Sequence, residues 1–337
     1  WLLLYVFVNL TSVLYLGALA MNTVMGVDMM WAIIGLSLFA AAYSLYGGLA
    51  SIAWTDSIQV VFLIFGGLAT TYLALNTVSD GQGMMEGLGI IYDKAPNKFA
   101  MILDESNPHY SELPGMSVLV GGMLINNLAY WGCNQYIVQR ALGADLKTAR
   151  KGILFAAFLK ILMPIIVVLP GIAAYVLYQN GGFQTEMLHD GSVNPDRAYP
   201  VLLNLLPVGL KGLSFAALTA AIVASLAGKA NSIATIFTLD VYKNKINTEA
   251  TDKKLISIGK ITIAIALFVA VLLAPFLGID KKGGFQYIQE YTGFVSPGVF
   301  AMFILGFFWK KTTSNAALFA IIGGFILSIL FKFMPGV

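Results

Sequence analysis

The chain is dominated by apolar blocks of about 20 residues with almost no charge, the length that crosses the hydrocarbon core of a bilayer as a helix. Hydrophobic residues make up 58% of the sequence and charged residues only 11%, which is too little charge to cover a soluble globule of this length. Only helices and closed barrels can span a membrane, because every backbone amide must find an internal partner. The blocks are continuous and do not alternate, which excludes barrel strands. The sequence therefore predicts an all-α polytopic membrane protein.

The hydropathy pattern predicts about nine spans in a single transmembrane domain over residues 1–337. The spans are near Trp1–Met21, Trp31–Tyr46, Trp54–Leu75, Pro114–Val138, Gly152–Leu177, Leu213–Leu239, Ile256–Leu277, Phe285–Phe308 and Ala316–Phe333. The loops after the fourth, sixth and eighth spans are short and rich in Lys and Arg, which places them in the cytoplasm. We therefore expect a multi-pass protein of the plasma (inner) membrane. Because the chain opens inside an apolar run, we also expect further helices upstream.

The residues that enzymes use for catalysis are sparse in this sequence. Cys133 is the only cysteine, so no intrachain disulfide can form. The two histidines and the scattered acids make no metal-ligand cluster, and no nucleophile is paired with a base. The net charge of +3 says little about partners. We expect the lipid bilayer as a partner, no nucleic acid and no enzymatic activity.

The fourth span contains polar residues that do not suit lipid. Asn127, Tyr130 and Trp131 lie at i, i+3 and i+4, so a helix places them on one face. One interpretation is an amide that binds a polar solute beside an aromatic gate. The other is that Asn126 and Asn127 join neighbouring helices, as asparagine often does in membranes. The glycines around these residues predict local unwinding of the span.

The fifth span contains a lysine about two turns from its start. Lys160 lies among apolar residues, and Pro164 and Pro170 predict a kink beyond it. Charged residues inside a span are functional candidates, because their exposure to hydrocarbon costs several kcal/mol. Lys160 either contributes to a solute cavity or reaches back to the cytoplasmic interface. Asn9 in the first span either contacts solute or makes an interhelical hydrogen bond, and the sequence alone favours the second.

The eighth span begins with polar residues on one face. Phe285 and Gln289 are one turn apart on that face, whereas Glu290 points elsewhere. Gly293 and the Ser296–Pro297–Gly298 run predict a break in this helix. Broken helices near the bilayer midplane are where transporters build solute and ion sites. The alternative interpretation is a helix cap at the membrane interface.

Small and hydroxyl-bearing residues run through the sixth span, around Ser225. Hydroxyls and freed carbonyls are hard oxygen ligands that suit Na⁺, and nothing soft is present there. The alternative is close packing of small residues between helices. Asp56, at the cytoplasmic start of the third span, is either a helix cap or a station for a departing cation.

Several strings in order along the whole chain resemble the sodium/solute symporter family, and within it the sodium/glucose and sodium/galactose branch, with bacterial sodium/galactose symporters most similar. The strings are YGGLASIAWTDSIQ, YWGCNQYIVQRALGA, FAALTAAIVASL, NSIATIFTLDVY and QYIQEYTGFVSPGVF. The resemblance implies a leucine-transporter-like inverted-repeat fold. It also implies that the spans are the third to tenth core helices plus one extra, with the N-terminal helices missing.

The resemblance further implies a site. The solute contacts fall on Asn9, Asn127, Lys160 and Gln289. The gating aromatics fall on Tyr130 and Phe285, with Trp131 lining the pocket. The Na⁺ ligands fall on the Ala221 carbonyl and the Ser225 hydroxyl, with Asp56 on the exit path.

One residue departs from the family pattern. Ala224 stands where a second hydroxyl residue is usual, which predicts weaker Na⁺ binding. The implied function is secondary active transport, a Na⁺-coupled symport of a sugar such as galactose or glucose by alternating access. Two alternatives stay open. One is symport of another polar solute (an amino acid, a polyol or a sialic acid) by the same fold, and the other is an uncoupled sugar sensor or leak pathway.

Overall fold

The structure is a computed structural model that describes residues 2–107, 110, 115–189, 191–277 and 283–334, and describes no side chains for residues 48–52. Among these residues the regular secondary structure is helical except for one antiparallel pair of short strands, β1 (Leu188–His189) and β2 (Ser192–Val193), with Leu188 opposite Val193. The predicted all-α class is therefore confirmed.

Helical stretches long and apolar enough to cross a membrane number eight among the described residues. They are Leu4–Met25, Met29–Gly47, Ala53–Val78, Leu146–Gln179, Val208–Ile246, Asp252–Phe276, Gly284–Phe308 and Ser314–Phe333. They match all the predicted spans except the fourth, near Pro114–Val138. That segment is helical but interrupted, as described below.

The described residues divide into two compact units, each built from two stretches of chain. Unit 1 comprises Trp1–Phe99 and Arg150–Gly284, and unit 2 comprises Ala100–Ala149 and Phe285–Val337. The prediction of a single transmembrane domain stays a prediction.

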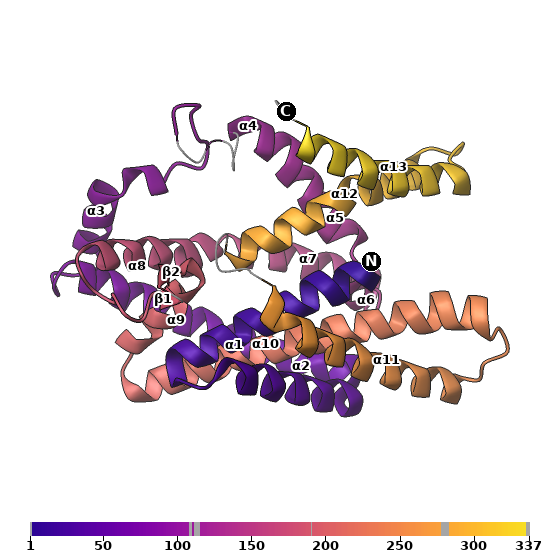
Figure 1. The fold of residues 1–337 in the computed structure, drawn as a ribbon, viewed down its shortest axis with the longest axis horizontal. Coiled ribbons are helices and arrows are strands. Elements are labelled where there is room, and N and C mark those ends of the chain that lie inside the picture. The colour runs from indigo at the N-terminus through magenta and orange to yellow at the C-terminus, as the bar shows by residue number, and fades with distance from the viewer. Residues whose placement is uncertain (1, 108–109, 111–114, 190, 278–282, 335–337) are drawn as a thin grey trace. The chain divides into compact units, whose positions relative to one another are not determined.

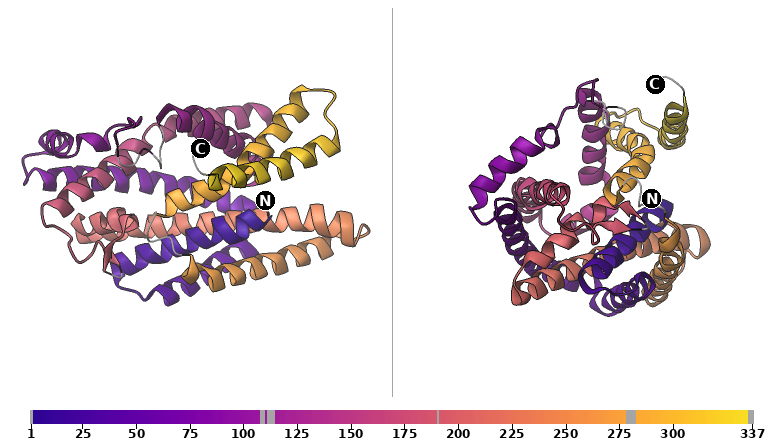
Figure 2. Two further views of the ribbon diagram at one scale, coloured as in Figure 1. Left: turned by 45° about the horizontal axis from the view of Figure 1, so that its top comes forward. Right: turned by 60° about the vertical axis from the view of Figure 1, so that its left-hand side comes forward.

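Unit 1 is a bundle in which α10 packs along both α2 and α11, and α1 along α2 (Figures 1 and 2). Its long elements are η1 (Leu4–Leu10), α1 (Thr11–Met25), α2 (Met29–Val78), α8 (Leu169–Gln179), α10 (Val208–Ile236), η7 (Phe237–Ile246) and α11 (Asp252–Leu273). Small residues on α10, such as Ala227 and Ala230, are fully buried, and they let neighbouring helices approach closely.

The α2 helix contains two spans. At 50 residues it would be about 75 Å long if straight, more than twice the thickness of a hydrocarbon core. The Tyr43 hydroxyl nevertheless forms a hydrogen bond with the Thr55 hydroxyl. A straight helix would separate these residues by about 18 Å, so the chain must turn back between them. The second and third predicted spans are thus two arms of one bent element.

The polar connectors of unit 1 contain short helices, as expected for segments at the membrane surface. They are α3 (Met84–Lys94), η2 (Pro96–Lys98), η5 (Pro195–Arg197), α9 (Ala198–Leu202), η6 (Leu203–Leu205) and η8 (Ala274–Phe276). The Lys94 Nζ donates to Asn180 Oδ1 at 3.0 Å, which joins the connector after the third span to the one after the fifth. These two connectors share one side of the membrane if the spans alternate, so the bond agrees with alternating spans.

The fifth span is interrupted where the prolines predict it. Helix α7 (Leu146–Lys160) ends at Lys160, and a turn leads into the π-helical η4 (Pro164–Val168) and then α8. The helix is thus irregular where the prolines lie, and the kink itself stays a prediction.

The fourth span is also irregular, in part at the glycines that predict local unwinding. It consists of α4 (Gly115–Ser117), η3 (Val118–Met123), α5 (Leu124–Cys133) and α6 (Gln135–Ala141). The glycine pair of this span lies in the π-helical η3, while Asn126 and Asn127 lie in regular α-helix. The full break is at Asn134, whose backbone is extended (φ −88°, ψ 122°) and whose side chain accepts from Tyr136 N–H to cap α6.

The eighth span corrects a prediction. Helix α12 (Gly284–Phe308) is continuous, with Pro297 inside it, so the predicted break around Ser296–Pro297–Gly298 is wrong. At Gly298, α12 packs against the backbone of α13 (Ser314–Phe333) with no side chain between the two helices. A Cβ on Gly298 would lie 2.4 Å from the Ala320 carbonyl oxygen, so only glycine permits this approach.

Candidate solute and sodium sites

Helix α5 in unit 2 carries three of the predicted solute and gate residues. Asn127 is half-buried, and its Nδ2 donates to Met123 O at 2.8 Å within its own helix. The rings of Tyr130 and Trp131 meet edge to face, with centroids 5.6 Å apart. Each ring is a little over one-third exposed, so the pair forms a partly open aromatic surface one turn from the Asn127 amide.

Helix α12 supplies the remaining solute candidate of unit 2. Gln289 is half-buried, and Phe285, one turn earlier, is 71% exposed. Further along, Ser296 Oγ lies 2.8 Å from Asn126 Oδ1 and donates to it, which ties α12 to α5. Asn126 thus takes the interhelical role that was one of its two interpretations. Because Ser296 and Gln289 are two turns apart, they share a face of α12.

Two solute candidates belong to unit 1. Lys160 is the last residue of α7 and is exposed, immediately before the interruption of the fifth span. Asn9 lies in the π-helical η1, half-buried, and its Nδ2 donates to Leu4 O at 3.4 Å. Of the two interpretations of Asn9, the described contact is neither solute nor interhelical but internal to its own helix.

The sodium candidates of unit 1 share one face of α10. Ala221 and Ser225 are one turn apart and both half-buried, whereas the intervening Ala224 is only 3% exposed. A carbonyl oxygen has two lone pairs, so Ala221 can accept its helical hydrogen bond and still face a cation. Without a hydroxyl, Ala224 can offer only its backbone.

Contacts within unit 1 relate Asp56 to α10. Asp56 is half-buried beside Thr55, whose hydroxyl meets that of Tyr43 across the bend of α2. Ser44, which follows Tyr43 in the sequence, donates from Oγ to Ala227 O on α10 at 3.3 Å. The bend of α2 that carries Asp56 is therefore anchored to the helix that carries the sodium candidates.

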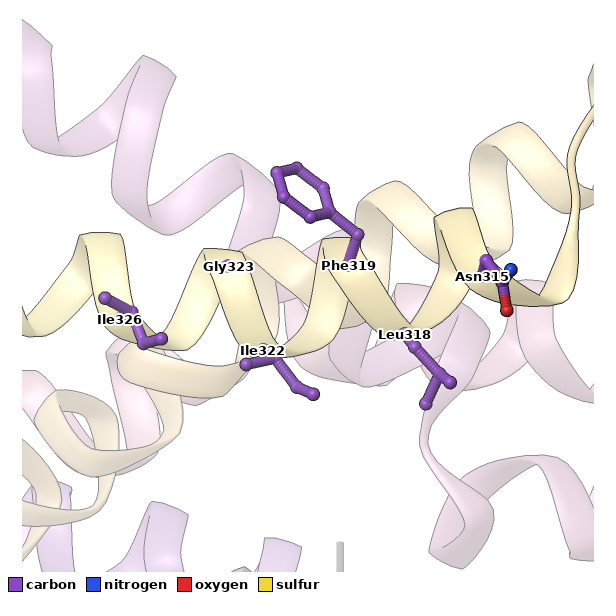
Figure 3. A pocket seen from close by; sticks show the side chains of 6 residues that line it. All are labelled: Asn315, Leu318, Phe319, Ile322, Gly323 and Ile326. Carbon is purple, nitrogen blue, oxygen red and sulfur yellow. The ribbon is translucent and has the colours of Figure 1, made fainter.

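The structure also contains a cavity of about 400 Å³ against α13. Its lining residues are Asn315, Leu318, Phe319, Ile322, Gly323 and Ile326 (Figure 3). The lining is apolar except for Asn315, and Leu318 and Ile322 point to one side of the helix while Phe319 points to the other. No sequence-predicted site residue lines this cavity, and its chemistry suits lipid chains. In the part of the chain that the structure describes, no three His, Cys, Asp or Glu side chains are grouped to hold a metal.

Sequence reasoning missed Asn134, the residue at which the fourth span breaks. Its burial and its capping bond to Tyr136 N–H mark it as a structural hinge directly after the aromatic pair. The available signal was its residue type, because asparagine is among the strongest N-cap residues.

Comparison with known proteins decides the family. Residues 1–324 match the family model of the sodium:solute symporters. The chain belongs to this family. It is 51% identical over 342 residues to the sodium/glucose cotransporter of Vibrio parahaemolyticus, covering 99% of this chain and 63% of that protein. It is 33% identical over 347 residues to the sodium/myo-inositol cotransporter 2 of Homo sapiens, covering 98% of this chain and 51% of that protein.

A solved structure is also similar in fold. The substrate-bound outward-open state of a Na⁺-coupled sialic acid symporter matches with a TM-score of 0.75 at 22% identity, covering 98% of this chain and 72% of that one. At this identity the likeness concerns the fold alone, and it confirms the predicted leucine-transporter-like class. The chain spans about half to two-thirds of the length of the curated relatives that it matches.

Proposed function

We propose that the protein carrying this chain is a Na⁺-coupled sugar symporter of the plasma (inner) membrane that works by alternating access. The observation that carries the proposal is the 51% identity, over nearly the whole chain, to a sodium/glucose cotransporter. The chemistry of the solute candidates agrees with it, since three of the four are neutral amides. Amides donate and accept hydrogen bonds, as an uncharged solute with many hydroxyls requires.

The solute candidates have complementary roles in this proposal. The Asn9 amide uses one N–H on its own helix, which orients it, and a second N–H and the oxygen remain to meet adjacent sugar hydroxyls. Asn127 and Gln289 contribute amides from unit 2, and Lys160 contributes a charged donor, which makes stronger hydrogen bonds than a neutral one. The aromatic rings of Tyr130, Trp131 and Phe285 exclude water from the bound sugar.

The coupling ion is bound by oxygen ligands. The Ala221 carbonyl and Ser225 hydroxyl provide hard oxygens for Na⁺, and Asp56 attracts the ion as it leaves towards the cytoplasm. The alanine at position 224 removes one potential oxygen ligand. We therefore expect Na⁺ to be held more weakly than in relatives with a hydroxyl at this position.

A polyol is the second candidate solute, because the chain is 33% identical to a sodium/myo-inositol cotransporter. A cyclic polyol presents hydroxyls much as a pyranose does, so the same amides suit both.

Uptake into liposomes tests the proposal. The protein at its full natural length is reconstituted, and entry of labelled galactose, glucose and myo-inositol is followed with an inward Na⁺ gradient and with K⁺ in its place. We expect hexose uptake that requires the Na⁺ gradient. Uptake that ignores Na⁺ contradicts symport, and uptake of myo-inositol alone moves the solute to the polyol class.

Single substitutions test the solute site in the same assay. Lys160→Ala and Gln289→Ala are each expected to raise the half-saturating sugar concentration about tenfold, the loss expected for one hydrogen bond to a buried polar solute. Matched controls are Lys151→Ala, exposed on the same helix as Lys160, and Asn315→Ala on α13. If both site variants behave like the controls, these residues do not bind the sugar.

A further inference from the structure

The interruption of the helix between Lys160 and α8, called the bend, has a cause in the sequence. Residue 164 is proline, which has no N–H, so the Lys160 carbonyl loses the donor that would continue α7. The chain tightens instead, with Ile161 N–H donating to Phe158 O and Leu162 N–H to Leu159 O, both at 3.1 Å. Lys160 therefore sits at the last position before the regular hydrogen bonding of the helix is interrupted.

A second proline deprives another carbonyl within the bend. At the end of η4 the Leu169 N–H donates to Pro164 O, five residues back. In this register the Ile165 carbonyl would receive its hydrogen bond from residue 170, which is proline. The Ile165 carbonyl thus receives no hydrogen bond from Leu169, which donates elsewhere, or from Pro170, which has no N–H. The hydrocarbon core contains no water that could donate instead.

A hydroxyl from another helix supplies the missing donor. Thr71 on α2 is only 3% exposed, and its Oγ1 lies 2.9 Å from Ile165 O. The same hydroxyl is 2.9 Å from Gly67 O, but that carbonyl already accepts the Thr71 N–H within regular helix. With a single hydrogen to give, the hydroxyl gains most by donating to Ile165 O.

The two elements meet so closely that the contact is fixed in place. A Cβ on Gly67 would lie 2.3 Å from Ile166 Cγ2, so the absent side chain lets the bend rest directly on α2. Ile166 is buried in this contact, only 8% exposed. The bend is thus held by packing at Gly67 and by one hydrogen bond at Thr71.

We propose that Thr71 is a positioning residue for solute binding: by replacing the N–H that Pro170 lacks, it fixes the bend that aims Lys160. The proposal rests on the proposed role of Lys160 in binding sugar. Thr71 itself does not touch solute. It acts through the direction in which α7 ends.

The test uses the half-saturating sugar concentration of the reconstituted full-length protein. Thr71→Val keeps the shape of the side chain and removes the donor, and we expect an increase of about fivefold, the factor that one net hydrogen bond represents. Thr71→Ser retains the hydroxyl and is expected to stay near the wild type. Thr262→Val is the control, because the Thr262 hydroxyl bonds only Ile258 O of its own helix, at 2.9 Å.

Two combined variants separate positioning from general damage. In a Lys160→Ala background, Thr71→Val is expected to change sugar affinity no further, since its effect passes through Lys160. In a Pro170→Ala background, residue 170 regains an N–H, so Thr71→Val is expected to lose its effect on the midpoint of thermal unfolding. Thr71→Ala replaces the valine variant if that protein does not fold.

The outcomes are distinguishable. The proposal is overturned if Thr71→Val binds sugar normally while Lys160→Ala does not, or if Thr71→Ser is as impaired as Thr71→Val. It is also overturned if the effect of Thr71→Val persists undiminished beside Pro170→Ala. If Lys160→Ala leaves sugar affinity unchanged, the proposed solute site fails and the positioning role fails with it, while the unfolding cycle still decides whether Thr71 serves the carbonyl.

Discussion

Two spans of this chain contain proline, and they respond differently to it. In unit 1 the fifth span is interrupted between Lys160 and α8, where Pro164 and Pro170 lie six residues apart. In unit 2 helix α12 runs unbroken through Pro297. The sequence predicts a distorted helix in both spans, so the presence of proline alone does not decide whether a helix is interrupted.

The difference lies in how many carbonyls lose their donors and what supports the helix nearby. A lone Pro297 deprives one carbonyl, whereas two prolines within two turns deprive two and leave little regular helix between them. In α12, Ser296 Oγ also lies 2.8 Å from Thr292 O, directly beside the deprived carbonyl of Gly293. Contacts with α13 also hold α12 on both sides of the proline. Support from neighbours thus keeps one helix continuous and holds the other at its interruption.

The largest expected effect comes from removing a charge that holds α12. Glu290 pairs with Lys332 of α13, and each is the only charged residue of its helix. Lys332 also lies over the Phe294 ring, 5.6 Å from its centroid. Removing the ammonium by Lys332→Met leaves a carboxylate in the span, which we expect to lower stability by about 2–3 kcal/mol.

Thermal unfolding in detergent or lipid measures this change. Reversing the pair, with Glu290→Lys and Lys332→Glu in one protein, is expected to recover most of the loss. Lys310→Met, in the exposed turn before α13, is the control. If the reversed pair is no better than Lys332→Met alone, the two charges do not support α12 together.

A second prediction tests the comparison through solute binding. Pro164→Ala supplies an N–H for Lys160 O and allows α7 to continue, which redirects Lys160. We expect the half-saturating sugar concentration to rise about tenfold, equivalent to about 1.4 kcal/mol. Pro297→Ala, in a helix that is already continuous, is expected to stay within about threefold of the wild type. Equal effects of the two variants would mean that the bend has no special bearing on binding.

A third, smaller effect is expected at Ser296. Ser296→Ala removes the hydroxyl beside the proline and the bond to Asn126, and we expect a loss of about 1 kcal/mol in unfolding free energy. Asn126→Ala is the partner variant. If the Ser296–Asn126 bond matters, the double variant loses less than the sum of the single losses, whereas simple additivity would count against it.

The smallest effect is expected at the start of α7, at Asp145. Its carboxylate accepts from the Thr148 side chain and from the backbone N–H groups of Thr148 and Lys147, and these bonds lower the pKa of Asp145. Because the folded pKa lies below the unfolded value, the contribution to stability is present at neutral pH and is lost as pH falls through the folded pKa. Unfolding midpoints from pH 7 to pH 3 for wild type and Asp145→Asn are expected to converge at low pH. A constant difference across this range would assign the effect to something other than titration.

Most of the span organisation could be predicted from the sequence, because length, hydropathy and basic loops act locally. The bend after Lys160 was predicted for the same reason, since Pro164 acts on a carbonyl only one turn away. The sequence did not predict that α12 is continuous or that the fourth span breaks at Asn134. Both depend on contacts with residues that are distant in the sequence, and the Ser296–Asn126 bond is an example, with its partners 170 positions apart.

The candidate site was predictable only as a set of residue types. Polar side chains within apolar spans identified Lys160 and Asn127, and family resemblance added the roles. The residues proposed to orient them, such as Thr71 for Lys160, have no feature in the sequence that distinguishes them from other residues of a membrane helix. A threonine on a membrane helix becomes informative only when the carbonyl that it serves is known.

The close approach of Gly298 to the backbone of α13 has a practical consequence. With no side chain between them at that point, the two helices have no room to slide past each other and should shift as one piece. A fluorescent or spin label on the outer face of α13, for example at Phe319, would then report the movements of the helix that carries Gln289. It would do so from the lipid-facing side, without altering any residue proposed to bind sugar.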